Sequence, residues 1–315
     1  MKLRVLLLGG NGFIGSHLID ALLKASFDVI VLDITPEHFR NPNPNAQYYY
    51  GNWNDLELLK TAVKQSDIVI HLISSSVPAS SNSQILNDTE INLTGTLQLV
   101  EVMQQYNKSN LIFFSSGGTV YGEPTQSPTP ESHLLQPLSA YGLLKATIES
   151  YLLWYQRSAN LKPIILRPAN IYGIRQSFLS NQGVIAHFLF KTLQNEPVEI
   201  WGTGQEVRDF VNVSDIANLV VMLCQSPWKP GIWNVGSGKG ISLLELIEII
   251  KKIAAKNVSL SYIQSTSSGI REIVLDRMAI YRHYGWEPAI SLEQGIAEQW
   301  KWLQQLHQEQ PLLFA

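Results

Sequence analysis

Short apolar runs alternate with segments of helical periodicity throughout the first half of the chain. The apolar runs are rich in Val, Ile and Leu, as in strands buried on both faces, and the segments between them have the period of amphipathic helices. Strand–helix–strand repeats of this kind build a parallel sheet with right-handed crossovers. The pattern predicts an α/β fold with a doubly wound parallel sheet, from strands near residues 4–10, 27–33, 46–52, 66–74, 110–116 and 162–173 and helices near residues 13–25, 55–65, 90–106 and 138–158.

The alternation weakens after Gly173, where the helical and extended segments become short and irregular. Residues 210–224 still resemble a strand that leads into a helix. Two later helix starts have the spacing of a capping box. They are Ser242 with Glu245, and Ser291 with Gln294.

This change in pattern predicts two domains. The first is a Rossmann-type domain at residues 1–168, to which the chain returns near residues 210–235. The second is a smaller domain of mixed α and β structure at residues 169–209 and 236–315. Ligands of doubly wound sheets bind outside the carboxyl ends of the strands. We therefore expect the site at the loops after Leu8, Leu32, Leu72, Phe114 and Leu166.

Composition narrows the class of protein. The 315 residues include 23 basic and 26 acidic side chains, for a net charge of -3, which disfavours nucleic acid and membrane surfaces as partners. The single cysteine, Cys224, excludes an internal disulfide and a cysteine-rich metal site, so we expect a cytoplasmic protein without a metal. The first apolar run is about five residues long, too short for the core of a signal peptide, and no run approaches the roughly 18 residues of a membrane span.

A glycine-rich segment follows the first predicted strand. Gly9, Gly12 and Gly15 in GGNGFIG let the backbone approach a pyrophosphate, which the following helix N-terminus attracts. Asp33 ends the second predicted strand, where its carboxylate can accept hydrogen bonds from both ribose hydroxyls. A carboxylate repels a 2′-phosphate, and Ile34 follows where an NADP site more often has Arg, so NAD is the expected cofactor. The alternative is a glycine-rich turn that only packs a helix on a strand.

Tyr141 and Lys145, in YGLLK, lie four residues apart and share a face of the predicted helix. An ammonium near a phenol stabilises the phenolate and lowers its pKa, which makes Tyr141 a candidate general base. The spacing alone also arises by chance. Its position after SSGGTVYG (residues 115–122) supports the catalytic interpretation. This hydroxyl-rich segment at the end of a strand is called the SSGGTVYG turn below.

These motifs resemble those of the extended short-chain dehydrogenases/reductases, and within them the group similar to UDP-glucose 4-epimerase. The resemblance covers nearly the whole chain and includes INLTGT (residues 91–96), RPANIYG (residues 167–173) and WGTGQEVRDFVNVSDIA (residues 201–217). It implies that the first domain binds NAD and the second a nucleotide-sugar, whose diphosphate would contact Asn170 and Arg208.

The resemblance also implies a set of site residues. The expected catalytic residues are Tyr141, Lys145 and Thr119. The residues expected to bind NAD are Gly9, Gly12, Phe13, Ile14, Gly15, Asp33, Asn52, Trp53, Leu72, Ser74, Asn92, Ser115, Tyr141, Lys145 and Pro168. The residues expected to bind the substrate are Ser116, Gly117, Asn170, Trp201, Arg208 and Arg271.

Several of these positions have simpler interpretations. Asn92 can cap a helix, Arg208 can pair with Asp209 at the surface, and Ser74 can belong to a solvated loop. His71, on an apolar strand, is expected to be a core histidine and is assigned no role.

Two positions depart from the family pattern. Asn52 stands where the family has an Asp that contacts adenine, and Thr266 stands where it has a second diphosphate-binding Arg. Arg271 lies nearby and is the candidate to replace that Arg.

The SSGGTVYG turn separates the reactions of the family. Relatives that dehydrate the sugar have Thr-Asp-Glu at the positions of Gly117, Gly118 and Thr119, and decarboxylating relatives have Glu at the last of these. This chain has no carboxylate there, which leaves reversible oxidation at C4 of the sugar. The expected activity is epimerisation at C4 of a nucleotide-activated hexose through a 4-keto intermediate. The alternatives are a nucleotide-4-keto-sugar reductase that uses NAD(P)H and a non-catalytic nucleotide-binding protein.

The turn also lacks the Ser or Thr that bridges tyrosine and sugar in most relatives, because Gly117 stands there. Thr119 is the first candidate to supply the hydroxyl and Ser116 the second, unless Thr119 only satisfies a local backbone group. UDP is favoured over dTDP as the nucleotide, and the sugar stays open. The resemblance further implies a homodimer through the helices near residues 90–105 and 141–157, the second of which has more apolar surface than one core face needs.

Overall fold

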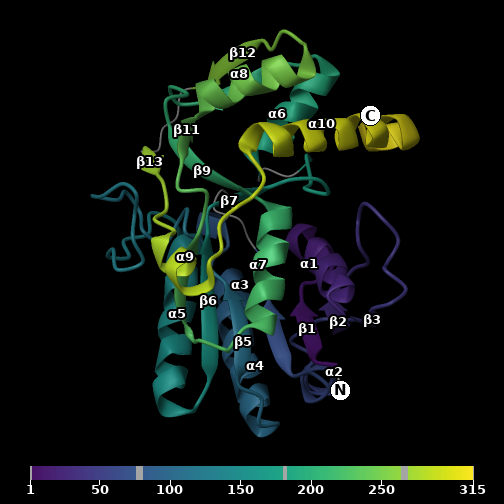
Figure 1. Ribbon diagram of the computed structural model, residues 1–315, viewed down its shortest axis with the longest axis vertical. Coiled ribbons are helices and arrows are strands. Elements are labelled where there is room, and N and C mark those ends of the chain that lie inside the picture. Colours follow the sequence, from purple (N-terminus) through teal and green to yellow (C-terminus); the bar gives the residue numbers. More distant parts are fainter. Residues whose placement is uncertain (1, 76–80, 180–182, 264–268, 315) are drawn as a thin grey trace. The chain divides into compact units, whose positions relative to one another are not determined.

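The computed structural model describes residues 2–75, 81–179, 183–263 and 269–314, which form two compact units (Figure 1). The first unit consists of Met1–Gly122, Leu134–Pro168 and Ile216–Asn234, and the second of Glu123–His133, Ala169–Asp215 and Val235–Ala315. The sequence analysis placed residues 123–133 and 210–215 with the first domain, whereas the structure has them in the second unit.

The first unit is built on a seven-stranded sheet with the strand order β10-β6-β5-β4-β1-β2-β3 (Figure 1). Its strands are β1 (Arg4–Leu8), β2 (Asp28–Asp33), β3 (Gln47–Tyr50), β4 (Ile68–His71), β5 (Asn110–Phe114), β6 (Lys162–Pro168) and β10 (Gly231–Val235). All neighbours from β6 to β3 pair in parallel. The direction in which strands are added reverses between β1 and β4, which is where ligands bind in such sheets. The predicted Rossmann-type fold is confirmed.

Helices cover both faces of this sheet, as the continuous apolar strands require. Alternate side chains of a strand point to opposite faces, so Leu6 and Leu8 of β1 share one face and Leu7 lies on the other. Leu6 and Leu8 belong to a buried cluster with residues of α2, α4 and α5, and Leu7 is equally buried. The helical elements are α1 (Phe13–Lys24), α2 (Leu56–Lys64), η1 (Ser81–Ser83), α3 (Ile85–Asp88), the π-helix η2 (Thr89–Thr94), α4 (Gly95–Gln105), α5 (Ala140–Ser158) and most of α7 (Val213–Gln225).

The second unit is a mixture of short strands and helices, as predicted. Strand β9 (Val207–Asn212) pairs in parallel with β7 (Asn170–Tyr172) and β13 (Glu272–Ile273) and antiparallel with β11 (Gly240–Ser242), while β8 (Val198–Trp201) pairs in parallel with β12 (Leu260–Ile263). Helices α6 (Val184–Gln194), α8 (Leu243–Ala254) and α10 (Leu292–Glu309) pack on one another (Figure 1). The shorter helices are α9 (Met278–Tyr284) and η3 (Pro311–Phe314). Both predicted capping boxes are present, at the starts of α8 and α10.

The described residues contain neither a membrane-spanning helix nor a metal-binding cluster. None of the helices in these ranges is long and apolar enough to cross a membrane. Over the same residues, no three His, Cys, Asp or Glu side chains gather closely enough to hold a metal ion.

Candidate active site

The loop between β1 and α1 brings the backbone unusually close to its neighbours. Gly9 has a φ of +77°, and an added Cβ there would lie 3.1 Å from Ile73. An added Cβ at Gly15 would lie 2.3 Å from the carbonyl oxygen of Gly10, so only glycine allows this approach of helix and loop. Helix α1 has no side-chain cap at Gly12 and no acidic residue in its first turn. Its N-terminal amides and dipole are therefore open to an anion.

Asp33, the last residue of β2, lies beside this loop. Its carboxylate accepts hydrogen bonds from the amides of Asn11 at 2.9 Å and Ile34 at 2.7 Å. The Asn11 side-chain oxygen is buried and has no hydrogen-bond partner among the described residues. These groups fit a dinucleotide: the amides of Phe13 and Ile14 begin α1, where the pyrophosphate would lie, and the carboxylate faces the place of a ribose.

Trp53 and His71 are core residues. Their ring centroids are 4.9 Å apart, both side chains are buried, and His71 Nε2 lies 2.9 Å from the Thr96 hydroxyl. Burial lowers the pKa of His71 to about 3, in agreement with its interpretation as a core histidine. Asn52 accepts a hydrogen bond from the Asn54 amide at 3.0 Å and so shapes the turn after β3. Trp53 has little surface left for the cofactor contact expected of it.

Asn92 is buried within the π-helix η2, so it is not the helix cap that the sequence left as an alternative. Its side chain accepts a hydrogen bond from the Ser75 amide at 3.1 Å and donates one to the Asp88 carbonyl at 2.8 Å. The loop that it holds starts with Leu72, whose amide donates to the Leu8 carbonyl at 2.9 Å. In this structure Asn92 shapes the loop after β4.

Tyr141 and Lys145 lie on the first turns of α5, where the Ser139 hydroxyl caps the helix. Lys145 Nζ donates a hydrogen bond to the Phe114 carbonyl at 3.0 Å and lies 5.7 Å from the centre of the Tyr141 ring. Burial lowers the pKa of Lys145 to about 8, and the charge of Glu149 opposes this shift. The two predicted catalytic residues are thus adjacent at the end of β5.

The Tyr141 hydroxyl is hydrogen-bonded to two serine hydroxyls, those of Ser74 and Ser116. Burial raises the pKa of Tyr141 to about 12, and the two serines oppose this shift because their hydroxyls favour the phenolate. The sequence predicted that Lys145 would lower this pKa. In the structure, burial raises the pKa of Tyr141 by more than its contacts lower it, and the contacts that lower it are the hydrogen bonds to the two serines. Ser74, expected to bind NAD, is here a direct neighbour of Tyr141.

Ser116, and not Thr119, places its hydroxyl beside that of Tyr141. Thr119 Oγ1 donates to the Ser116 carbonyl at 3.4 Å, which is the local contact that the sequence left as the alternative. The Gly117 amide donates to the Pro168 carbonyl at 2.8 Å and ties the turn to the end of β6. An added Cβ at Gly118 would have no other atom within 4 Å.

Sequence reasoning missed a buried ion pair beneath the turn. Arg167 Nη2 lies 2.5 Å from Glu149 Oε2, and both side chains are almost fully buried. The Ser115 hydroxyl, expected at the cofactor, donates to the Glu149 carboxylate. A signal was available, because Glu149 continues the four-residue spacing of Tyr141 and Lys145 and Arg167 interrupts an apolar strand.

The expected ligands of the substrate diphosphate lie in the second unit. Asn170 Nδ2 donates to the Asp209 carbonyl at 3.0 Å. The Arg208 guanidinium donates to backbone carbonyls, including that of Ile270 at 2.8 Å. The Asp209 carboxylate is buried and accepts hydrogen bonds from Ser237, so Arg208 and Asp209 do not form the surface ion pair considered above.

Arg271 and Trp201 are largely exposed. The Arg271 side chain is 88% exposed and lies 3.5 Å from the Glu123 carboxylate, a surface ion pair that costs little to break. Trp201 ends β8 and is also mostly open to solvent. Thr266, at the position of the missing second Arg, lies outside the described residues.

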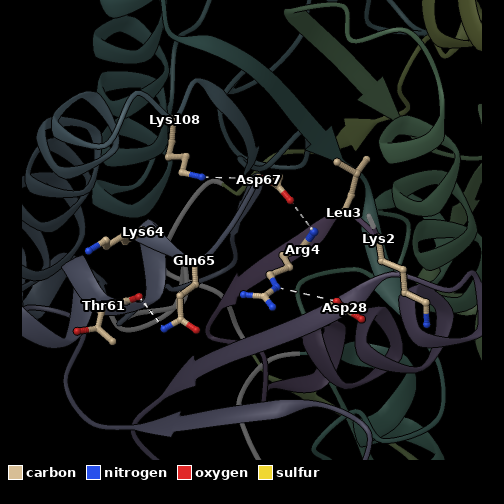
Figure 2. Close-up of a pocket in the computed structure, with 9 residues that line it drawn as sticks. All are labelled: Lys2, Leu3, Arg4, Asp28, Thr61, Lys64, Gln65, Asp67 and Lys108. Carbon is tan, nitrogen blue, oxygen red and sulfur yellow. Dashed lines mark hydrogen bonds and ion pairs between the residues drawn. The ribbon is translucent and has the colours of Figure 1, made fainter.

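A cavity of about 920 Å³ lies elsewhere in the first unit (Figure 2). Its walls include Arg4 and Asp28, which begin β1 and β2, and Asp67, which precedes β4. The Asp67 carboxylate accepts a hydrogen bond from the Arg4 amide at 2.9 Å, as Figure 2 shows. This cavity is at the amino ends of the strands, whereas Tyr141 and the glycine loop lie at their carboxyl ends. It is not part of the candidate site.

Known proteins have sequences and structures similar to those of this chain. A Methanocaldococcus jannaschii protein provisionally named a UDP-glucose 4-epimerase is 37% identical over 95% of the chain and 98% of its own length. An Escherichia coli dTDP-4-dehydro-6-deoxyglucose reductase is 30% identical over 93% of the chain and 95% of its own length. The Thermotoga maritima UDP-glucose 4-epimerase, solved with UDP-glucose, superposes with a TM-score of 0.91, at 32% identity over 96% of the chain and 99% of that structure.

A family model also matches most of the chain. It matches residues 5–236, a segment that contains the glycine loop, Asp33, the SSGGTVYG turn, Tyr141 and Lys145. The resemblance seen in the sequence is confirmed. The chain belongs to the NAD dependent epimerase/dehydratase family.

Proposed function

We propose that the chain is an NAD-dependent enzyme that epimerises C4 of a nucleotide-activated hexose, with a UDP-sugar as the favoured substrate. The arrangement around Tyr141 carries the proposal. Its hydroxyl contacts Ser116 and Ser74, and Lys145 lies one helical turn further on. A phenol held in this way beside a dinucleotide site is suited to move a proton to and from a sugar hydroxyl.

The first unit would hold NAD at the carboxyl ends of β1 and β2. The glycine loop and the open N-terminus of α1 would take the pyrophosphate, and Asp33 the ribose hydroxyls, which favours NAD over NADP. NAD held there would supply reversible hydride transfer at C4, so that an epimerisation would involve no net oxidation. This separates an epimerase from an enzyme that consumes its cofactor.

Tyr141 has the role of the acid and base at the C4 hydroxyl. It takes the hydroxyl proton as the 4-keto sugar forms and gives it back when the sugar is reduced. The phenolate form is stabilised by hydrogen bonds from Ser116 and Ser74. Ser116 also supplies the hydroxyl that is missing at Gly117. An ammonium has three donors, and only one of those of Lys145 is needed for the Phe114 carbonyl, so the others can hold a ribose hydroxyl.

We assign the substrate diphosphate to the second unit. Arg208 uses part of its five-donor guanidinium on backbone carbonyls, which fixes its position and leaves donors for a phosphate. Asn170 is held by the Asp209 carbonyl, and the exposed Arg271 is the candidate second cation. Trp201, exposed at the end of β8, is a candidate contact for the uracil ring.

We further propose a cytoplasmic homodimer. On α5, Ile148 and Leu152 are buried in the core, but Leu143, Tyr151 and Trp154 are 59%, 41% and 51% exposed. These three lie on one side of the helix, with Thr147 and Ser150 between them, and large exposed apolar side chains on one side of a helix are typical of an interface. The cytoplasmic location rests on the lone cysteine of the sequence.

A 4-keto-sugar reductase is the second candidate, because the Escherichia coli relative with that name is 30% identical over most of the chain. The same Tyr141 would then protonate a C4 oxygen once, and NAD(P)H would be consumed in each turnover. The absence of a carboxylate from the SSGGTVYG turn disfavours dehydration and decarboxylation for both candidates.

The test is to incubate the purified protein with UDP-glucose and other UDP-hexoses, without added cofactor, and to analyse the sugars. Formation of the C4 epimer supports the proposal. Conversion of a 4-keto sugar alone, with stoichiometric loss of NADH absorbance, establishes the reductase instead. Inactivity on all sugars, with NAD binding unchanged by Tyr141→Phe, would establish a non-catalytic nucleotide-binding protein.

A further inference from the structure

The SSGGTVYG turn is held at both ends by one buried ion pair. Its two glycines give its middle little stiffness of its own, yet Ser116 must meet Tyr141 within hydrogen-bonding distance. The residues that anchor the turn are Ser115 at its start and Tyr121 near its end, both buried.

At the start of the turn, the Ser115 hydroxyl donates a hydrogen bond to Glu149 Oε1. Glu149 lies on α5, one helical turn after Lys145, whose Nζ donates to the carbonyl of Phe114 at 3.0 Å. Two adjacent residues at the end of β5 are thus bound by two consecutive turns of α5. These contacts fix the end of the strand against the helix that carries Tyr141.

At the other end of the turn, Tyr121 is fully buried and its hydroxyl accepts a hydrogen bond from Arg167 Nη1 at 2.9 Å. The same hydroxyl donates to Asn234 Oδ1 on β10 at 2.6 Å. The Arg167 guanidinium also lies 5.0 Å from the centre of the Tyr121 ring. Arg167 is on β6, so this end of the turn is fastened to the sheet.

Glu149 and Arg167 join the two ends. Arg167 Nε lies 3.1 Å from each carboxylate oxygen of Glu149, and Nη2 lies 2.5 Å from Oε2. Buried ion pairs of this kind contribute little net stability, because desolvation offsets the attraction, but they fix geometry when each group is fully hydrogen-bonded. Here the Glu149 carboxylate accepts a hydrogen bond from Ser115, and the Arg167 guanidinium donates one to Tyr121.

We propose that Glu149 and Arg167 are positioning residues for the proposed reaction, and that their ion pair sets where Ser116 lies relative to Tyr141 by holding both ends of the SSGGTVYG turn. The inference rests on the proposed function for its catalytic consequence, but the hold on the turn itself does not depend on it. Neither residue touches the reacting atoms.

The decisive variant is Tyr121→Phe, which cuts one anchor and leaves the ion pair intact. Tyr121 is fully buried, so its hydroxyl has no contact with a ligand to lose. Ser115→Ala cuts the other anchor in the same way. Glu149→Gln is a poorer choice because it leaves the buried Arg167 without a counter-ion and endangers folding.

Ser66→Ala is the matched control. Ser66 is a fully buried serine of the first unit whose hydroxyl donates to the Val63 carbonyl at 2.9 Å, and it follows α2, away from the turn. Its loss removes a buried hydroxyl and its hydrogen bond to the backbone without touching the anchors. The control therefore reports what a merely structural change does.

Two readouts separate the inference from the proposed function. Amide hydrogen exchange needs neither sugar nor activity, and we expect Tyr121→Phe and Ser115→Ala to lose protection at Gly117, Thr119 and Val120, whose amides are hydrogen-bonded within or to the turn. In the epimerase assay we expect kcat to fall about tenfold or more in both variants, with KM changed less than about threefold. Ser66→Ala should change neither readout.

Unchanged exchange at the turn in both variants overturns the inference, whatever the assay shows. Loss of protection with kcat equal to that of the wild type also overturns it, because the anchors would then have no catalytic consequence. A wild-type protein that is inactive on every UDP-hexose, but whose turn loses protection in the variants, refutes the proposed function and leaves the hold on the turn established.

Discussion

Replacing Ser116 with Ala tests which hydroxyl compensates for the glycine at position 117. In the structure the Ser116 hydroxyl meets the phenol of Tyr141, while Thr119 Oγ1 binds a backbone carbonyl at 3.4 Å. We therefore expect Ser116→Ala to lower kcat strongly and Thr119→Val to change it less than about twofold. From the sequence alone, Thr119 was the first candidate.

The magnitude follows from the charge on the accepting oxygen. A hydrogen bond to an ionised group contributes about 1.5–3 kcal/mol, and each 1.36 kcal/mol corresponds to one pKa unit or a tenfold change in rate. Burial already raises the pKa of Tyr141 to about 12, and losing the Ser116 hydroxyl raises it further. The kcat of Ser116→Ala should fall about 10- to 100-fold. Ser74, the second hydroxyl at Tyr141, keeps the loss from being larger.

The assay is the interconversion of UDP-hexose epimers under saturating substrate, with NAD affinity measured separately by titration. Thr119→Val is the matched control, because it removes a hydroxyl of the same turn and leaves the volume unchanged. The double variant Ser74→Ala/Ser116→Ala should lose more than either single variant. A Ser116→Ala enzyme with normal kcat, or a Thr119→Val enzyme with the larger defect, would refute the assignment of the hydroxyl.

Three other side chains of the first unit allow separate tests. The pKa of Lys145 is lowered to about 8, so its charge is present below that pH and lost above it. We therefore expect kcat to fall as the pH rises through about 8. If the lysine causes this fall, it should be absent from the pH profile of Lys145→Arg. Asp33→Asn should weaken NAD binding about tenfold and reduce the preference for NAD over NADP, and an unchanged ratio of the two affinities would count against the ribose contact. Trp154→Glu puts a charge on the exposed side of α5 and should convert a dimer to a monomer in light scattering without lowering Tm; a wild-type monomer would end the dimer proposal.

The local apolar pattern was enough to predict the strands β1 to β6 of the first unit, since strands buried on both faces leave a continuous run, but it did not predict β10, which completes the sheet. The same pattern could not show where a strand changes partners. Residues 162–173 were expected to form one strand, but the Ala169 amide binds the Val235 carbonyl at 2.8 Å and the chain divides there into β6 and β7. Strand β7 pairs with β9, about forty residues later in the chain, and no nearby residue encodes that pairing.

Long-range contacts also explain why residues 123–133 belong to the second unit and not, as expected, to the first. Residues 123–133 lie in the second unit because Thr129 pairs with the chain at Leu275, through its amide to the Val274 carbonyl at 2.7 Å. Motifs and spacing located Tyr141, Lys145 and the glycine loop correctly with respect to the strands. They could not decide between Ser116 and Thr119, because the contacts of the turn come from distant parts of the chain, such as the hydrogen bond from Ser115 to Glu149, 34 residues away.

The open space at Gly118 has a consequence for how new activities arise on this scaffold. Gly118 is not among the glycines with positive φ, and a side chain there would meet no atom within 4 Å at its Cβ. Its backbone conformation and the space at its Cβ therefore do not require glycine. A carboxylate at this position, one of the three that dehydrating relatives differ in, could then be added with less destabilisation than usually accompanies a mutation near an active site. For a protein engineer, Gly118 is the place to graft a carboxylate.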